Sequence, residues 1–209
     1  MKDGIDVKCS EWEYEDHPEA ERVTERCRRL VLMLKGRPRI FNGYSTLRAH
    51  RYMFHGVTPE NCGYFAGNYR GSNFPCLKEY RVIAGNDSRV GTPPKDVKFE
   101  MSLFEAHLGF AVKTFAQDLQ KAGKFDRKLL LSLAELLAKY LVYYFTIHPY
   151  ANGNGHTGRL IVLVILKRFQ LDPQSWPLDD RPNYSAAIVA HRDGNPTPLR
   201  DFILDRILN

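Results

Sequence analysis

The sequence predicts a mainly α-helical domain that carries one small β-hairpin. Apolar residues recur every three or four positions along most of the chain, which is the spacing of a helix face packed on a core. A single short run, Tyr80–Ile83, has the composition of a strand, and turn-forming residues at 85–88 follow it. Strands and helices do not alternate along the chain, so a parallel α/β sheet is not expected.

Two helices are expected near the start of the chain. Pro18 suits a first helical turn, and Gly36 ends that helix. Ser45 is placed to cap a shorter helix that ends at Gly56. The glycine-rich stretch over 58–94 is expected to form loops and the hairpin. The apolar face of the first helix consists of Val23, Cys27, Leu30, Val31 and Leu34.

Two longer helices follow, and the second is expected at the centre of the domain. Asp126 can cap it, its apolar face is broad, and His148–Pro149 ends it, because the residue before a proline disfavours helical geometry. Further helices are expected over 160–171, 184–193 and 198–208. The apolar face of the first long helix, which ends at Gly123, consists of Val97, Met101, Phe104, Leu108, Val112, Phe115 and Leu119.

The composition is that of a globular protein with an excess of basic residues. The chain has 209 residues, of which 44% are hydrophobic, and 30 Lys and Arg against 24 Asp and Glu give a net charge of +6. This length suits one domain. The densest basic cluster, over 22–39, lies in or just after a helical pattern, so a solvated helix face is the favoured interpretation. Nucleic-acid binding, for which only the charge argues, is a minor alternative.

The sequence also indicates where the protein acts. Its four cysteines form no CxxC pair, and no Cys/His cluster has the spacing of a zinc site. The N-terminal residues are polar, and the longest apolar run, Leu160–Leu166, is too short to span a bilayer. We therefore expect a cytoplasmic protein without a membrane partner, with export as an effector left open.

The segment over 148–159, HPYANGNGHTGR, carries the chemistry. Its glycines allow successive backbone N–H groups to point into one concavity, and a helix start directly after them favours an anion such as phosphate. Arg159 lies about one helical turn further, where it can contact a second phosphate. His148, at the other lip of the loop, is the one obvious general base there.

The same segment also fits the dinucleotide-binding pattern G-x-G-x-x-G from Gly153 to Gly158. Asp179 even lies about 20 residues on, where such a fold places an acidic residue. This interpretation is rejected, because the preceding helical spacing extends back to Leu129 and no series of parallel strands follows.

At these residues the chain resembles the Fic (filamentation induced by cAMP) family, whose signature is H-P-F-x-[D/E]-G-N-G-R-x-x-R. Gly67–Arg70, the hairpin with Pro93-Pro94 and the segment over 199–208 are also similar to family elements. The resemblance implies a Fic fold over residues 45–209, a helical bundle around the motif loop, with residues 1–44 as a helical extension packed on it. The signature is matched by His148, Pro149, Gly153, Asn154, Gly155 and Arg159, with Tyr150 in place of Phe.

The resemblance implies a nucleotidyltransferase that moves AMP from ATP to a Tyr, Thr or Ser hydroxyl of a target protein and releases pyrophosphate. His148 would accept the hydroxyl proton, and Asn154 and the backbone of Gly153 and Gly155 would hold the α- and β-phosphates. Arg159 would hold the γ-phosphate or orient the β- and γ-phosphates. Arg89 and Val90, on the hairpin flap, are candidates for docking the target. Arg70 is expected to order this flap region or to lie near the target, and a role in structural hydrogen bonds is an equal alternative.

Two positions depart from the signature. Asn152 replaces the carboxylate that in the family binds the metal ion, and an amide is a weaker ligand for Mg²⁺. His156 replaces the first arginine, so its expected contact with the β-phosphate is weaker. The nucleotide donor and the metal site are therefore less certain than the transfer chemistry. Transfer of a phosphoryl or phosphocholine group and a degenerate nucleotide-binding module are the alternatives.

The inhibitory motif S/T-x-x-x-E-G/N, which in this family holds the second arginine, is absent from the sequence. A separate small antitoxin-like protein is therefore hypothesised as an inhibitory partner.

Overall fold

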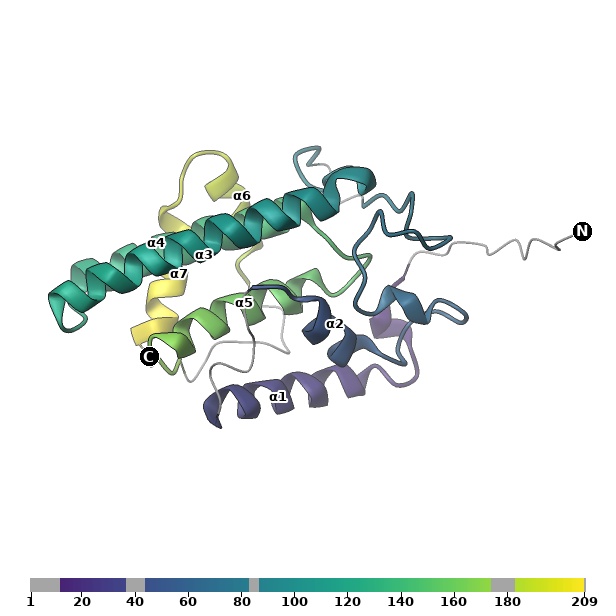
Figure 1. Cartoon of the computed structure of the whole chain (residues 1–209), viewed down its shortest axis with the longest axis horizontal. Coiled ribbons are helices and arrows are strands. Elements are labelled where there is room, and N and C mark those ends of the chain that lie inside the picture. The colour runs from purple at the N-terminus through teal and green to yellow at the C-terminus, as the bar shows by residue number, and fades with distance from the viewer. Residues whose placement is uncertain (1–11, 37–43, 83–86, 174–182, 209) are drawn as a thin grey trace, which may run out of the picture.

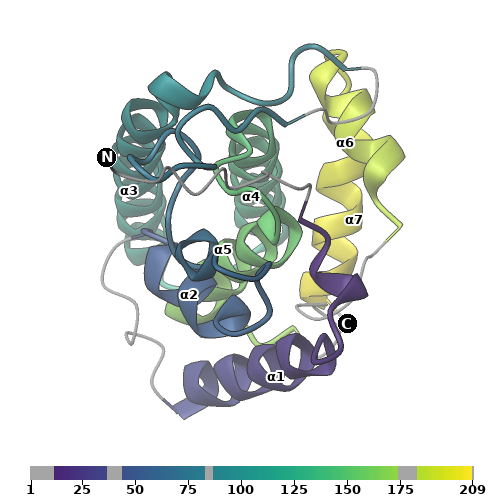
Figure 2. The same cartoon turned by 90° about the vertical axis from the view of Figure 1, so that its right-hand side faces the viewer.

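The computed structural model of the chain describes residues 12–36, 44–82, 87–173 and 183–208. These residues form a helical assembly (Figure 1, Figure 2) with short 3-10 turns at Tyr14–Asp16, Gly63–Phe65 and Pro94–Asp96. The α-helices are α1 (Glu21–Gly36), α2 (Leu47–Phe54), α3 (Val97–Ala122), α4 (Arg127–Ile147), α5 (Asn154–Arg168), α6 (Ser185–Arg192) and α7 (Thr197–Leu208). The expectation of a mainly α fold is confirmed.

Helix α4 is the central element, as its broad apolar face predicts. It packs against α3, α5, α6 and α7, while α1 packs against α2 and α5. Figure 2 shows α3 and α7 on opposite sides of α4. By length and composition alone α4 also meets the criterion for crossing a membrane, but 56% of that apolar window is buried within the protein. Its apolar character is therefore explained by its place in the core.

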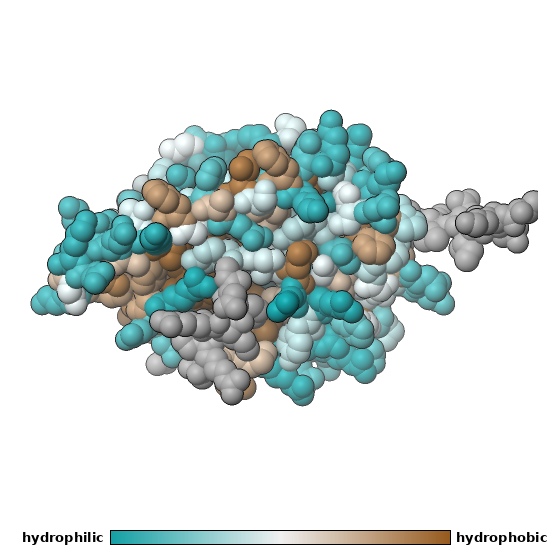
Figure 3. Space-filling view, viewed as in Figure 1, coloured by the Kyte–Doolittle hydropathy of each residue, from teal (hydrophilic) through white to brown (hydrophobic). Residues whose placement is uncertain are grey.

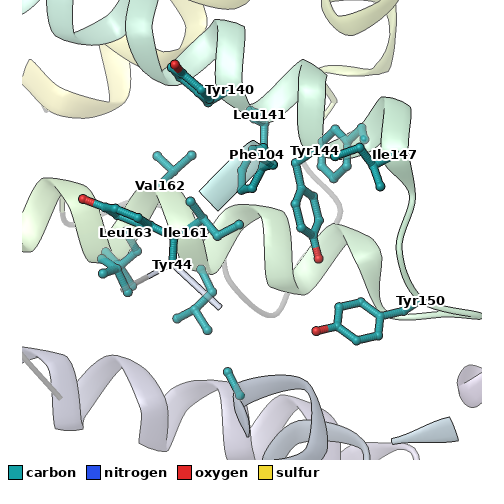
Figure 4. Packing of buried hydrophobic residues seen from close by; sticks show 14 of the residues in the cluster. Tyr44, Phe104, Tyr140, Leu141, Tyr144, Ile147, Tyr150, Ile161, Val162 and Leu163 are labelled. Carbon is teal, nitrogen blue, oxygen red and sulfur yellow. The ribbon is translucent and has the colours of Figure 1, made fainter. Parts of the chain in front are cut away.

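The core continues from α4 to α5 through a close helix contact. Figure 4 shows Leu141 and Tyr144 of α4 near Ile161 of α5, with Phe104 of α3 beside them. A Cβ atom on Gly158 would lie 2.8 Å from the Phe145 ring, so only glycine allows this approach. On the outside, Figure 3 shows a mainly hydrophilic face with separate hydrophobic patches.

Two boundaries of α3 and α4 are confirmed by their caps. The Leu129 N–H donates to the Asp126 side chain at 2.7 Å, and Gly123 has a left-handed φ of 74° after α3. The expected cap at Ser45 is wrong. Helix α2 follows Thr46, which has no side-chain cap bond, because its hydroxyl instead lies 2.7 Å from the Tyr150 hydroxyl.

The expected β-hairpin is not observed among the described residues. Residues 80–82 and 87–90 form no strand, and residues 83–86 lie outside the described residues. The following residues pair with a helix instead: the N–H groups of Gly91 and Thr92 donate to the carbonyls of Thr146 and Ile147. The second arm of the flap region is therefore attached to the C-terminal end of α4.

Candidate active site

The site is the loop between the C-terminus of α4 and the N-terminus of α5. His148 ends α4 in a left-handed conformation, with φ 52°. Gly153 precedes α5 with φ 78°, and α5 begins at Asn154, so the helix expected at the motif glycines starts within the motif itself. The end of the motif is thus the first turn of α5, whose N–H groups lack intrahelical partners and favour an anion.

Arg70 fixes one lip of this loop. Its side chain is 1% exposed and donates to the carbonyls of His148 (2.7 Å), Tyr80 (3.1 Å), Thr92 (3.0 Å) and Ile147 (3.0 Å). Burial lowers the pKa of Arg70 to about 10, so it stays charged at neutral pH. The expected structural hydrogen bonds are observed, and they also order the flap region, because the guanidinium joins the end of α4 to both of its arms.

His148 is half-buried at this lip. Burial, and next the positive charge of Arg70, lower the pKa of His148 to about 4. The imidazole is therefore neutral at pH 7 and has a nitrogen lone pair that can accept a proton.

Asn154 closes the loop on itself. Its side-chain oxygen accepts the Tyr150 N–H and its side-chain nitrogen donates to the Tyr150 carbonyl, each at 2.9 Å. Asn154 is 3% exposed, so in this arrangement its amide stabilises the loop conformation. The groups that remain for binding a phosphate are the backbone N–H groups at the start of α5, which are called the cradle below.

His50 is a part of the site that the sequence did not reveal. Its Nδ1 accepts the Gly67 N–H and its Nε2–H donates to the Asn152 carbonyl, each at 2.9 Å. Its ring stacks on Tyr150 at 3.7 Å between centroids. Burial lowers the pKa of His50 to about 3, so the ring is neutral at pH 7. It connects α2 to the motif loop. The two partners of His50 lie in segments far from it along the chain, so no spacing pattern in the sequence could reveal these contacts.

Arg159 lies at the far lip of the loop. Its guanidinium is buried, and a Cβ atom on Gly155 would lie 2.9 Å from Nη1. Nη1 donates to the Tyr184 hydroxyl at 3.3 Å, and Nη2 lies 3.4 Å from His156 Nδ1. The structure thus places a cation beside the first turn of α5, and its contact with a phosphate stays a prediction.

His156 is held by protein groups on the side of α5 that faces the N-terminal segment. It is 6% exposed, and its Nε2 lies 2.8 Å from the Tyr14 hydroxyl. Its Nδ1 lies near Cys27 Sγ (3.6 Å) as well as Arg159. Both ring nitrogens therefore have protein partners, and the ring belongs to the packing between α5, α1 and the N-terminal segment.

Asn152 does not fit the expected Mg²⁺ site. Its side-chain oxygen accepts the N–H of Gly153, and its NH₂ group donates to the Trp12 carbonyl (2.7 Å) and to Glu13 Oε2 (3.1 Å). A Mg²⁺ ion is bound through oxygen atoms, but the oxygen of this amide already accepts a backbone N–H and its nitrogen is held by two other protein groups. Within the described ranges, no group of three or more His, Cys, Asp and Glu side chains could hold a metal.

The two docking candidates differ in accessibility. Arg89 is exposed and binds Asp87 and Asp193, each at 2.8 Å, so it links the flap region to the end of α6. Its hydrogen bonds lower the pKa of Asp87 to about 2. Val90 is 8% exposed and packs inward. The Arg89 side chain is therefore accessible at the surface and the Val90 side chain is not, and docking of a target there stays a prediction.

Comparison with known structures defines the class of fold. The chain matches BepC, a VirB-translocated effector protein of Bartonella tribocorum with bound AMPPNP, at TM-score 0.56 and 18% identity, covering 89% of this chain and 86% of that one. It also matches the N-terminal Fic domain of a putative cell filamentation protein of Bartonella quintana, a VirB-translocated Bep effector protein, at TM-score 0.55 and 20% identity, covering 89% and 82%. The fold is that of a Fic domain.

The model of the Fic/DOC family matches residues 44–166, more than half of the chain, and includes the whole motif. The protein belongs to this family. No curated protein matches the sequence. The division into an extension over 1–44 and a domain over 45–209 stays a prediction.

Proposed function

We propose that the protein transfers a nucleoside monophosphate, with AMP from ATP as the first candidate, to a Tyr, Thr or Ser hydroxyl of a target protein. The observation that carries this proposal is the pairing, across one short loop, of a neutral His148 with the N-terminus of α5. Family membership and the Fic fold support a Fic-type transferase. The AMPPNP bound to the similar BepC supports a nucleoside triphosphate as the donor.

In the proposed reaction the target hydroxyl oxygen attacks the α-phosphorus and its proton passes to His148. The bond from the α-phosphorus to the bridging oxygen breaks, and pyrophosphate leaves. The N–H groups of the first turn of α5 stabilise the phosphate charge, and Arg159 adds positive charge at the far lip. Positioning and charge stabilisation supply most of the rate in such transfers. Because Asn152 does not fit a metal ion, no step is assigned to one.

The test is transfer of label from nucleoside triphosphates to proteins of a host lysate. With the α-phosphate labelled, the wild-type protein should label at least one protein, and His148→Ala should reduce this labelling by 100-fold or more, because general base catalysis contributes about 10²–10⁴-fold. His107→Ala, at an exposed position on α3, is the matched control and should keep wild-type activity.

Each labelled position and donor identifies a different reaction. Labelling from the α-phosphate of one nucleotide names the donor. Labelling only from the γ-phosphate would replace the proposal by phosphoryl transfer. Labelling that His148→Ala leaves unchanged would contradict the assigned base.

A nucleotide-binding module without catalysis is the second candidate, and the positions of Asn152 and His156 favour it. Both side chains are bonded to the N-terminal segment and not directed to the cradle. Binding of ATP to the purified protein, together with no transfer from any donor, would establish this module.

A further inference from the structure

We propose that residues 12–14 form a permanent wall of the candidate site, and that Tyr14 is a positioning residue that fixes Arg159 through His156. The proposal rests on the proposed function only where it concerns nucleotide affinity. It assigns a role to the two positions that depart from the family signature: they anchor the N-terminal segment.

Both departures contact the segment over residues 12–14, Asn152 at its first two residues and His156 at its third. Asn152 donates to the Trp12 carbonyl and to the Glu13 carboxylate, and His156 bonds the Tyr14 hydroxyl. The signature residues at these positions would be an acid and an arginine. A carboxylate at position 152 could not donate to the two oxygens, so the amide suits this contact.

Trp12 makes the contact permanent. It is 3% exposed and packs against Phe54 and Phe65 with ring centroids 5.7 and 5.6 Å apart. Its indole N–H donates to the Val57 carbonyl at 3.0 Å. Removing a buried tryptophan from such a contact is unfavourable, since it exposes a large apolar surface and breaks a buried hydrogen bond. Hence the segment is a wall of the site and not a cover that opens.

The His156 ring transmits the position of Tyr14 to Arg159. An arginine N–H can only donate, so the Nδ1 atom that faces Arg159 Nη2 must be the acceptor. With Nδ1 as the acceptor, the N–H of the ring is on Nε2, which donates to the Tyr14 hydroxyl. The hydroxyl thus fixes the ring orientation, and the ring fixes one side of the guanidinium, whose other side is held by Tyr184.

The first test is the affinity for ATP, measured by titration calorimetry on the full chain. Tyr14→Phe removes only the hydroxyl and should raise the Kd about fivefold, the effect of one buried hydrogen bond. Tyr52→Phe, at an exposed tyrosine of α2, is the matched control and should leave the Kd unchanged. A Kd for Tyr14→Phe that is unchanged or lower than wild type would overturn the proposal.

The second test separates positioning from general stabilisation. His156→Asn keeps an amide near the Nδ1 position but cannot reach Tyr14, so it should raise the Kd as Tyr14→Phe does, and the double variant should add no further loss. Two losses that multiply in the double variant would contradict the connection through His156.

The third test needs no nucleotide. Hydrogen exchange of backbone amides over 153–159 should become at least severalfold faster in Tyr14→Phe than in wild type, and stay unchanged over α3. Equal exchange rates over 153–159 would overturn the anchoring. If the wild-type protein binds no ATP, the proposed function fails, while this measurement still decides the anchoring.

Discussion

At the scale of single residues, Gly153 is the position where the site tolerates least change. Its φ of 78° is left-handed, and a Cβ atom there would lie 2.3 Å from the Phe54 ring and 3.1 Å from His50 Nε2. The backbone at the start of α5 is therefore compatible only with glycine, for reasons of both conformation and space.

Gly153→Ala should lower the free energy of unfolding by about 2–3 kcal/mol, because left-handed strain of about 1 kcal/mol adds to the clash with Phe54. Gly123→Ala is the matched control, since Gly123 has φ 74° but open space around its Cβ position. Gly123→Ala should lower the free energy of unfolding by only about 1 kcal/mol. Urea denaturation measures both values, and equal losses would show that the contact with Phe54 does not matter.

Residue types in the motif were sufficient to select His148 and Arg159 as candidates, because the chain order itself places them at the two ends of one loop, and their roles stay predictions. His50 and Tyr14 were not found. They reach the loop from about 100 and 140 residues away in sequence through hydrogen bonds, and such contacts leave no local pattern.

At the scale of elements, the C-terminal end of α4 depends on Arg70. Three of the four carbonyls that the guanidinium binds belong to residues 147, 148 and 92, and the fourth belongs to Tyr80. A helix C-terminus leaves carbonyls without partners and favours a positive charge. One buried side chain therefore completes α4 and holds the flap region against it.

Arg70→Lys should destabilise the protein by about 3 kcal/mol although it keeps the charge, because lysine cannot reproduce the planar fork of donors. Arg48→Lys, at an exposed position on α2, should change the stability by less than about 0.5 kcal/mol. Thermal and urea unfolding of both variants provide the measurement. A stable Arg70→Lys protein would indicate that water or a lysine satisfies these carbonyls.

Element boundaries were predictable where a local signal sets them. Asp126 and Gly123 act within one turn of their helices, and both predictions hold. Thr46 is bonded to Tyr150, a residue of another segment, so the cap predicted at Ser45 did not form. The attachment of Gly91 and Thr92 to α4 is likewise tertiary, which is why a local strand pattern could not reveal it.

At the scale of the whole molecule, folding encloses two neutral histidines. The pKa of His50 is about 3 and that of His148 about 4, both below the ordinary value of 6.5 because of burial. The unfolded chain therefore binds more protons than the folded protein once the pH falls below about 6.5. Stability must decrease as the pH falls through this window, until the folded histidines are also protonated.

We expect the free energy of unfolding to fall by up to about 2 kcal/mol between pH 6 and pH 5, since each group contributes at most about 1.4 kcal/mol per pH unit and His148 is only half-buried. His148→Ala should show a smaller slope, and the exposed His107→Ala the wild-type slope. Urea denaturation at several pH values measures this. A stability that is constant from pH 7 to pH 5 would contradict the neutral burial of these rings.

The two hydrogen bonds between the Asn154 side chain and the Tyr150 backbone have a consequence for the rate of ligand binding. These bonds, together with those from His50 to the Asn152 carbonyl and from Arg70 to the His148 carbonyl, hold the loop in one conformation before any ligand binds. The conformational entropy of the loop is lost once, when the chain folds, and not again at each encounter. Association with a phosphate group at this loop should therefore proceed as a rigid-body step, in a single kinetic phase whose rate rises linearly with ligand concentration.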